Sequence, residues 1–279
     1  MATSVLRQEH ELLGGLIQEE GALLGPVRYA DEDVELAAFD VGAALVDLTG
    51  MGMWLVSGAP AQAFCEAACA GPRLSVGTCA LGACLLGDGS VASVPLLVRT
   101  GASEYLILDA SPRMDVLFSW LGFVAHIERD GVRPYDGLAM SDETASLVPL
   151  ALAGPTAPAV LSDYVPGDVH QRLPLAGEVA NLDLDGRITT IVCALDFPQP
   201  AYLVLVPPIY ARAIWRSLLS FGSVMPVGHA ALRTWMARGT AVLSQLPVPD
   251  RLTIGEGELR ASGMVREGMD FIGARGLAG

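Results

Sequence analysis

The chain has 279 residues, of which 52% are hydrophobic and 17% are charged, and its formal net charge at pH 7 is −14. This apolar content excludes a disordered, solvated chain, and the length allows one large domain or two small ones with real cores. The negative charge would repel a long phosphate backbone, so we expect no nucleic-acid partner.

The longest uncharged stretches, residues 48–65 and 145–162, are both interrupted by glycine or proline. Neither offers the ~20 consecutive apolar residues that a membrane-spanning helix needs. The first residues, MATSVLRQEHELLGG, carry acidic side chains where a signal peptide has its apolar core. We therefore expect no membrane association and a cytoplasmic location. The apolar excess fits either a large core or a buried subunit interface, so a homo-oligomer or a partner subunit stays open.

The five cysteines are an odd number without a secretion signal, which indicates reduced thiols. Cys65 and Cys69 lie four residues apart, and Cys79 and Cys84 follow them, so a four-thiolate metal site is conceivable. Their spacing is wider than the CxxC of metal-binding knuckles, and their neighbours are alanine, leucine and glycine. We interpret them as small buried hydrophobes and predict no metal site. The histidines are isolated and show no metal-binding spacing: His10, His126, His170 and His229.

The first half of the chain alternates apolar segments with glycine and proline breaks. We expect, in chain order, a helix over residues 4–24, a strand over 53–56, a helix from Pro60 to Gly71, hairpin strands over 78–86 and 91–98, a strand over 104–108 and a helix over 112–121. Pro60 suits the first turn of its helix, and Ser111 suits the N-cap of the last one. Pro95 lies inside the second hairpin strand, which predicts an edge strand or a bulge there.

The second half repeats this mixture. We expect strands over residues 148–152, 186–192 and 202–206, and helices over 155–161, 209–220 and 228–238. Strands and helices mix without a regular βαβ pattern, and no short repeat or flexible linker is visible. The sequence therefore predicts an α+β protein.

Several landmarks follow one another over nearly the whole chain. They are residues 47–52 (DLTGMG), 56–64 (VSGAPAQAF), Gly77, Gly89, 105–110 (YLILDA), 152–157 (LAGPTA), 206–207 (VP), 214–219 (IWRSLL), 226–228 (PVG) and 270–273 (DFIG). Each landmark is weak alone. Their order and spacing resemble the folate-binding region of the glycine-cleavage T-protein family of aminomethyltransferases.

The resemblance implies that residues 1–279 form one folate-binding region of two intertwined α+β lobes. Lobe A would hold approximately residues 1–45 and 141–279, and lobe B approximately residues 46–140. A folate pocket would lie near the junction of the lobes. Full-length relatives continue into a C-terminal β-barrel, and this sequence stops before it, so we expect no C-terminal β-barrel.

Positions that carry the family's chemistry are altered in this sequence. The acidic pair of the family, which works on the folate amine, falls on Ser93 and Val94. A carboxylate suits that task because it stabilises a developing cation, and neither residue offers one. A tyrosine of the family falls on Leu81, which keeps an apolar wall without a hydroxyl. The asparagine at the end of a family strand has become Asp109.

The family's pterin-binding glutamate falls on Gln199, which offers an amide but no charge, unless a shift of the loop brings in Asp196. The family's arginine falls on Met236, and a modest shift in register would replace it with Arg233 or Arg238. By this resemblance the expected folate-binding residues are Met51, Leu81, Val94, Asp109, Gln199 and Arg233. No catalytic residue is assigned.

The resemblance implies a tetrahydrofolate-binding protein of methyl or aminomethyl transfer, with folate as its small-molecule partner and without normal glycine-cleavage activity. If the protein is an enzyme, it would be a tetrahydrofolate-dependent methyl- or aminomethyltransferase. The alternative is a non-catalytic binding or structural subunit of a larger methyl-transfer complex, in which side chains could fill the pocket. The resemblance alone does not decide between them.

Overall fold

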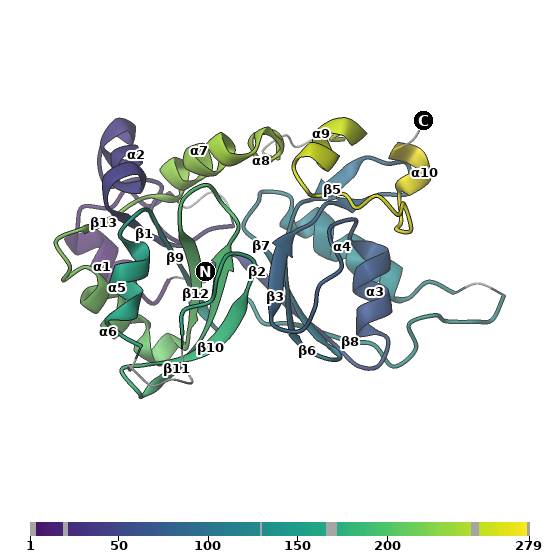
Figure 1. The fold of residues 1–279 in the computed structure, drawn as a ribbon, viewed down its shortest axis with the longest axis horizontal. Helices are drawn as coiled ribbons and strands as arrows, with labels where there is room; N and C mark the ends of the chain where they lie inside the picture. The colour runs from purple at the N-terminus through teal and green to yellow at the C-terminus, as the bar shows by residue number, and fades with distance from the viewer. Residues whose placement is uncertain (1–3, 19–21, 129, 166–171, 247–250, 278–279) are drawn as a thin grey trace. The chain divides into compact units, whose positions relative to one another are not determined.

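The computed structural model describes residues 4–18, 22–128, 130–165, 172–246 and 251–277. The chain divides into two compact units, Met1–Met51 with Thr144–Gly239 and Gly52–Glu143 with Thr240–Gly279 (Figure 1). Each unit is built around its own β-sheet. None of the described helices combines the length and apolar character that a membrane-spanning helix requires.

The sheet of the first unit has six strands in the order β10-β11-β12-β9-β1-β13. They are β1 (Ala43–Asp47), β9 (Val148–Ala153), β10 (Val179–Leu184), β11 (Ile188–Leu195), β12 (Ala201–Val206) and β13 (Val224–Pro226). Only the β1–β13 pair is parallel among these neighbours. Every residue of β1, β9 and β12 is buried, which is expected of central strands that are apolar on both faces.

The described residues of the first unit form five helices. They are α1 (Arg7–Leu12), α2 (Glu32–Val41), α5 (Ala157–Ser162), α6 (Pro208–Leu218) and α7 (His229–Gly239). Proline suits the first position of α6, and the residues that α6 buries recur on one helical face: Ala211, Ile214, Trp215 and Leu218. These side chains join Leu45 and Val204 in the apolar core of the unit.

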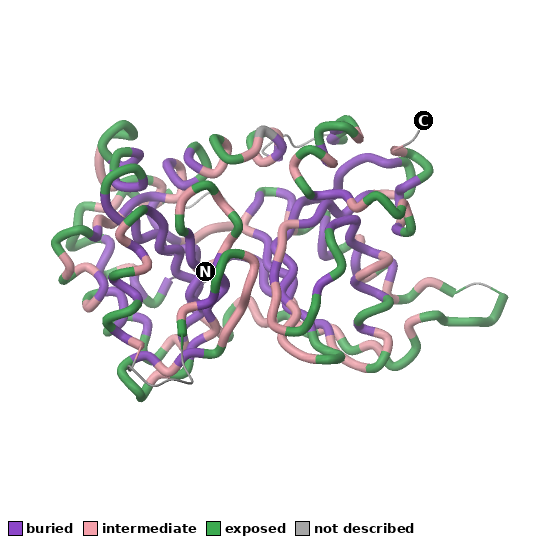
Figure 2. Tube along the Cα trace, viewed as in Figure 1, coloured by how far each residue is buried: buried purple, intermediate pink, exposed green. Residues whose placement is uncertain are grey.

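The second unit has a five-stranded antiparallel sheet in the order β3-β6-β7-β2-β8 and a separate β4–β5 pair. The strands are β2 (Gly52–Ser57), β3 (Thr78–Leu81), β4 (Cys84–Leu85), β5 (Val91–Ser93), β6 (Leu96–Gly101), β7 (Glu104–Asp109) and β8 (Ala139–Asp142). Two helices, α3 (Ala61–Ala68) and α4 (Met114–Ala125), pack Phe64, Leu117 and Leu121 against Ile107 of the sheet. Figure 2 shows these packed faces as buried.

The two long hairpin strands expected over residues 78–86 and 91–98 are each divided in the structure. The first breaks between β3 and β4, and the second breaks at Val94 and Pro95 between β5 and β6. Proline cannot donate a ladder hydrogen bond, so the pairing changes there: β3 pairs with β6, and β4 pairs with β5. The Pro95 carbonyl accepts a hydrogen bond from Gly82 N at 3.1 Å.

Two other expected elements differ. The helix predicted over residues 4–24 is only α1, because Gly14 follows it with a φ of 77°, a conformation that favours glycine and ends a helix. Ser111 is not the N-cap of α4, which begins at Met114. Its hydroxyl instead accepts a hydrogen bond from Arg113 N at 3.1 Å, in the turn before the helix.

Residues 240–279 were expected in lobe A, but the described ones among them, 240–246 and 251–277, pack with the second unit. They contain α8 (Ala241–Gln245), α9 (Glu256–Ala261) and α10 (Ala274–Leu277). Their apolar side chains and those of β4 and β5 form what we call the C-terminal cluster: Leu85, Val91, Val94, Val242, Leu246, Leu252, Leu259, Met264 and Phe271. Val91 N donates to Leu252 O at 2.7 Å and Ala83 N to Met264 O at 3.0 Å. Landmark order could not reveal this pairing, because it depends on tertiary contacts.

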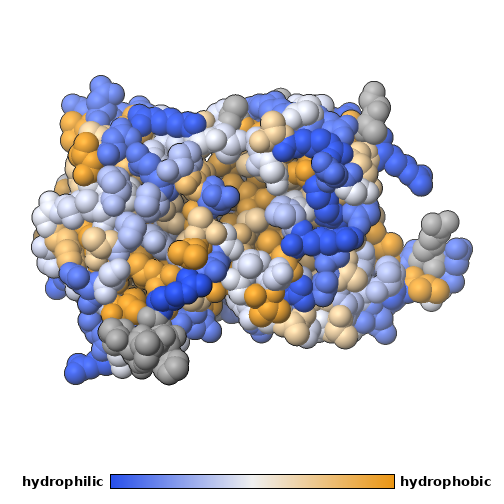
Figure 3. All heavy atoms as spheres, viewed as in Figure 1, coloured by the Kyte–Doolittle hydropathy of each residue, from blue (hydrophilic) through white to orange (hydrophobic). Residues whose placement is uncertain are grey.

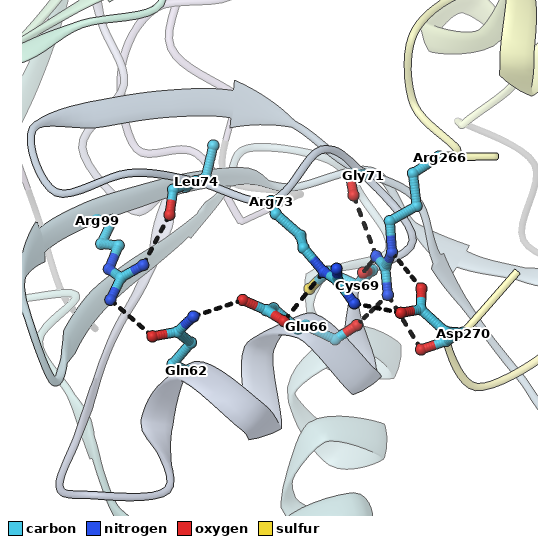
Figure 4. Close-up of polar contacts among 9 residues, drawn as sticks. All are labelled: Gln62, Glu66, Cys69, Gly71, Arg73, Leu74, Arg99, Arg266 and Asp270. Carbon is cyan, nitrogen blue, oxygen red and sulfur yellow. Dashed lines mark hydrogen bonds and ion pairs between the residues drawn. The ribbon is translucent and has the colours of Figure 1, made fainter. Parts of the chain in front are cut away.

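Arg266 ties the same segment to the end of α3 (Figure 4). Its guanidinium donates to Asp270 Oδ1 at 2.6 Å and to the carbonyl oxygens of Cys69, Gly71 and Glu66 at 2.7, 3.1 and 2.5 Å. Arg73, which pairs with Glu66 and Asp270, extends the network. The N–H groups of the Arg266 guanidinium are thus satisfied by backbone carbonyl oxygens in fixed positions. The planar guanidinium of arginine suits such an arrangement because it holds its donors in a rigid fork.

Apolar side chains also reach the surface at scattered positions. Figure 3 shows hydrophobic residues among hydrophilic ones on one face of the molecule. Ile209 of α6 is 83% exposed and Phe123 of α4 is 69% exposed. Isolated apolar residues are normal on protein surfaces, so they identify no interface by themselves.

A buried polar network joins the N-terminal segment to the end of β1. His10 Nε2 lies 2.8 Å from Asp47 Oδ2, and His10 Nδ1 lies 2.6 Å from the Tyr29 hydroxyl. Ser4 and Thr49 donate their hydroxyls to the two oxygens of Asp47, at 2.8 and 2.5 Å. The side chains of His10 and Asp47 are fully buried, so the loss of either one leaves a buried polar atom of the other without this bond.

We expect His10→Ala to lower the free energy of unfolding by roughly 2–5 kcal/mol, because it removes one partner from a buried pair. Urea denaturation monitored by circular dichroism measures this change. His126→Ala is the matched control: His126 is exposed, its Nδ1 lies 2.8 Å from the carbonyl oxygen of Gly122, and we expect a change within about 0.5 kcal/mol. Equal effects of the two substitutions would contradict the assigned role of His10.

We expect Arg266→Met to keep the aliphatic packing of the side chain but to release the C-terminal segment. Hydrogen exchange should then accelerate at Arg266 N and Ile272 N, which donate to Ala70 and Ala67, and not in β7. Arg260→Met is the control, since Arg260 pairs with Glu256 of its own helix. Uniform acceleration over the whole second unit would show that the contact is not local.

Candidate functional site

The six predicted folate-binding residues divide between the two units. Leu81, Val94 and Asp109 lie in the second unit, whereas Gln199 and Arg233 lie in the first. Met51 is the last residue of the first unit's N-terminal part and directly precedes β2. It is 4% exposed. The geometry of each unit is therefore described separately.

In the second unit the sheet register gathers the predicted residues at one end of the strands. Leu81 ends β3 and pairs with Leu96, which pairs with Leu108 on β7. The next residue of β7, Asp109, pairs with Gly52 at the start of β2. Leu81 and Asp109 thus lie two strands apart, roughly 10 Å, at the same end of the strands.

Val94 lies in an apolar environment. It is 4% exposed and belongs to the C-terminal cluster, and Leu81 packs partly buried against the same cluster. Neither residue has a polar group for a ligand. Both positions therefore form an apolar wall, which described residues from 242–246 and 252–274 of the same unit cover.

Asp109 has a polar environment. It is 2% exposed, and its Oδ1 accepts a hydrogen bond from Ser111 N at 2.8 Å. The hydroxyls of Ser111 and Ser93 lie 2.9 Å apart. The second carboxyl oxygen, Oδ2, is buried without a hydrogen-bond partner. Burial raises the pKa of Asp109, and the hydroxyls of Ser93 and Ser111 and the charge of Arg113 oppose this rise.

Asp88, another aspartate of the second unit, has a different environment. Asp88, in the turn between β4 and β5, is exposed and accepts hydrogen bonds from the Ser90 backbone and hydroxyl at 2.9 and 2.6 Å. It also pairs with Arg251 at 2.8 Å. The bonds from Ser90 lower the pKa of Asp88, so it is an ionised turn residue.

In the first unit, Gln199 lies in the loop between β11 and β12. It is half-buried, and its Oε1 is buried without a hydrogen-bond partner, whereas Asp196 in the same loop is exposed. The ring of Phe197 lies 5.4 Å from that of Trp235, which stacks on Phe39 at 4.8 Å. The loop therefore places the buried oxygen of Gln199 two residues after Phe197, whose ring contacts the stacked rings of Trp235 and Phe39.

Arg233 is exposed on α7, and Met236 of the same helix is half-buried. One turn before Arg233 is His229, whose Nδ1 is buried without a partner. Burial and the charge of Arg233 lower the pKa of His229 to about 4, although Asp47 opposes them. Sequence reasoning missed His229, and its place directly after the 226–228 landmark was the available signal.

Among the described residues, no group of three or more histidine, cysteine or acidic side chains is arranged to hold a metal ion. The five cysteines are buried and free of disulfides. Cys69 Sγ and Cys84 Sγ lie 3.1 Å apart, and burial raises the pKa of Cys84. A buried thiol of raised pKa is a poor nucleophile, so Cys84 has the character of a buried core residue.

The two units and their sheets define a two-unit α+β protein. Residues 6–238 match the GCVT N-terminal domain, and the chain belongs to this family. The resemblance seen in the sequence is therefore confirmed, and so is the α+β class. After β13 the described residues form helices α7 to α10 and no strand, so the described chain contains no C-terminal β-barrel.

Individual relatives are similar at low identity. The aminomethyltransferase of Prosthecochloris aestuarii is 24% identical over 240 residues, which are 84% of this chain and 64% of that protein. The aminomethyltransferase of Symbiobacterium thermophilum is 24% identical over 279 residues, 98% of this chain and 73% of that protein. The crystal structure of the glycine cleavage system aminomethyltransferase T of Bartonella henselae matches 99% of this chain and 74% of its own, with a TM-score of 0.79 and 21% identity. This match establishes the fold.

Proposed function

We propose that the chain is a tetrahydrofolate-binding protein of methyl or aminomethyl transfer that lacks normal glycine-cleavage activity. Its family supports the first part, since relatives over 84% and 98% of the chain are named aminomethyltransferases. The altered chemical positions support the second. The observation that carries the proposal is the buried, unpartnered carbonyl oxygen of Gln199.

A buried acceptor without a donor costs free energy, and a ligand that supplies the donor recovers it. The pterin ring of tetrahydrofolate has N–H donors on its amidine edge, so it fits Gln199 Oε1. The pair would be neutral. A glutamate at this position would form a charge-assisted pair of about twice the strength. We therefore propose specific but weakened pterin binding.

The glutamate tail of folate is anionic and needs a local cation, because the protein as a whole carries a charge of −14. Arg233 offers an exposed guanidinium on α7. We propose that it binds the tail. When bound, tetrahydrofolate supplies the amine nitrogens that carry the one-carbon group, and the residues of this chain bind and orient it.

A non-catalytic binding or structural subunit is the second candidate. The packing of Val94 and Leu81 with the C-terminal cluster favours it, because apolar side chains occupy the positions that carry a carboxylate and a hydroxyl in the family. Binding and turnover must therefore be measured separately. The two candidates share the fold and differ in whether the chain transfers a one-carbon group; a non-catalytic subunit either holds folate without turnover or, in a structural role, does not bind it.

Calorimetric titration with tetrahydrofolate tests the binding proposal. We expect saturable binding by the wild type, roughly tenfold weaker binding by Gln199→Ala, and roughly three- to tenfold tighter binding by Gln199→Glu. Gln8→Ala and Gln8→Glu are matched controls at an exposed glutamine of the same unit and should not change the affinity. Wild-type protein that is folded and gives no binding heat or protection from unfolding would refute the proposal.

Aminomethyl transfer from the methylamine-loaded carrier to tetrahydrofolate should be at least about 10²-fold slower than with an authentic aminomethyltransferase assayed in parallel, because Val94 supplies no acid or base. Val94→Asp should not rescue it. The substitution buries a carboxylate in the C-terminal cluster, and we expect it to lower the urea midpoint. A normal wild-type rate of methylenetetrahydrofolate formation would disprove the loss of activity.

A further inference from the structure

Two cysteines of the second unit face each other where the end of α3 meets β4. Cys69 is the residue at which α3 ends, and Cys84 is the first residue of β4. The two residues pair as an antiparallel bridge, and their sulfur atoms lie 3.1 Å apart. Their side chains therefore point toward one another from two different elements of the unit.

The backbone register explains this placement. Ala70 N donates to Ala83 O at 2.7 Å, so the hydrogen bond joins the two residues that flank the cysteine pair. Flanking bonds of this kind identify a non-hydrogen-bonded antiparallel pair, in which the Cα atoms lie closest, at about 4.5 Å. That spacing falls within the range of roughly 4.4–6.8 Å over which a disulfide joins two Cα atoms.

Two glycines keep the two backbone segments this close. Two residues further along the same register, Gly71 lies opposite Gly82. A Cβ atom added to Gly71 would lie 2.6 Å from the Cα of Gly82, and one added to Gly82 would lie 3.1 Å from the Cα of Gly71. A side chain at either position would push the segments apart. The glycines therefore hold the cysteines within bonding reach.

Residues 264–272 are bonded to both sides of the cysteine pair. Arg266 donates its backbone N–H to Ala70 O at 2.8 Å and its guanidinium to Cys69 O at 2.7 Å (Figure 4). On the side of β4, Ala83 N donates to Met264 O at 3.0 Å. The docking of residues 264–272 thus depends on the distance between the end of α3 and the start of β4.

The two thiols are shielded from solvent while these residues are docked. Cys69 is 3% exposed, and Cys84 is fully buried. Burial and the neighbouring Cys69 thiol raise the pKa of Cys84, so little of it is present as the thiolate that attacks a disulfide. Reaction with an outside reagent therefore needs local opening of the structure around the pair.

We propose that Cys69 and Cys84 are a reversible redox pair, which a small-molecule disulfide oxidises to an intramolecular disulfide when residues 264–272 open, and that the new bond fixes the site where those residues dock. This inference goes beyond the proposed function and does not depend on it. In the reduced form the two cysteines are the buried apolar side chains that the sequence predicts. Disulfides in reducing surroundings are typically transient and redox-sensing, which fits a reversible pair.

The reaction is two successive thiol–disulfide exchanges. In the first, the Cys69 sulfur attacks the reagent, whose S–S bond breaks and releases one reagent thiol. In the second, the Cys84 sulfur attacks the Cys69 sulfur of the mixed disulfide and releases the second reagent thiol. The two cysteines lose two electrons and two protons, and the reagent sulfurs receive both, so the exchange is balanced.

Equilibration of the folded full chain with reduced and oxidised glutathione tests the pair. After alkylation and digestion without reductant, we expect mass spectrometry to find two of the five thiols lost and one peptide that joins Cys69 to Cys84. Dithiothreitol should restore both thiols. A wild type that keeps all its thiols in excess oxidised glutathione, stops at a mixed disulfide, or joins Cys65 to Cys69 would overturn the inference.

Variants separate this pair from other buried cysteines and test the opening. Cys69→Ala should prevent the cross-link, whereas Cys193→Ala, at a fully buried cysteine of the first unit, should leave it unchanged. Arg266→Met should form the cross-link at least about tenfold faster than Arg260→Met, because it loosens residues 264–272 beside Cys69. Equal rates in the two arginine variants would overturn the assigned opening. If Cys69→Ala does not fold, the peptide map of the wild type still decides.

Hydrogen exchange of the oxidised protein tests the effect on docking. The disulfide would close a loop that spans 15 residues, which predicts a roughly 10²-fold smaller equilibrium constant for opening of the second unit. Exchange at Ala70 N, Ala83 N and Arg266 N should slow accordingly, and exchange at Gly154 N of the first unit should not change. Unchanged exchange at the first three amides in cross-linked protein would overturn the proposed effect on docking.

Discussion

The absent backbone N–H of Pro95 is the constraint on which the second unit depends. A proline there stops the long hairpin from continuing as one ladder, so β4 and β5 leave the sheet and pair with each other. The separated pair offers one side to the C-terminal segment, where Val91 bonds to Leu252. Its other contacts bring Ser93 to Ser111. The C-terminal cluster and the contact between Ser93 and Ser111 both follow from this one break.

Sequence patterns predicted the elements whose signals are local. Helices over residues 209–220 and 228–238 are present because a proline start or a periodic apolar face is sufficient to specify them. The helix over residues 4–24 was too long, since Gly14 stops it after α1. Residues 240–277 carry no strand alternation and only short helices, so their partner could not be read from the sequence. Their docking depends on the shape of β4 and β5, which is a tertiary property.

The candidate site divides in the same way. Asp109 and Gln199 could be named by counting from landmarks, but their unpaired oxygens could not, because burial and missing partners exist only in the folded chain. The apolar setting of Val94 was also invisible, and it changes the chemistry: a carboxylate placed there would be costly. Counting from the landmarks identified the altered residues. It did not show that Asp109 has polar neighbours whereas Val94 has apolar ones.

The two units differ in how they treat buried carboxylates. The first unit satisfies each of its buried carboxylates, so this fold is able to do so. A purely structural role would be served better by an asparagine at 109, which keeps the bond from Ser111 N without a buried charge. The aspartate instead leaves the protein with an unmet hydrogen bond and a raised pKa. A buried acceptor without a donor costs free energy, so Asp109 lowers the local stability of the second unit.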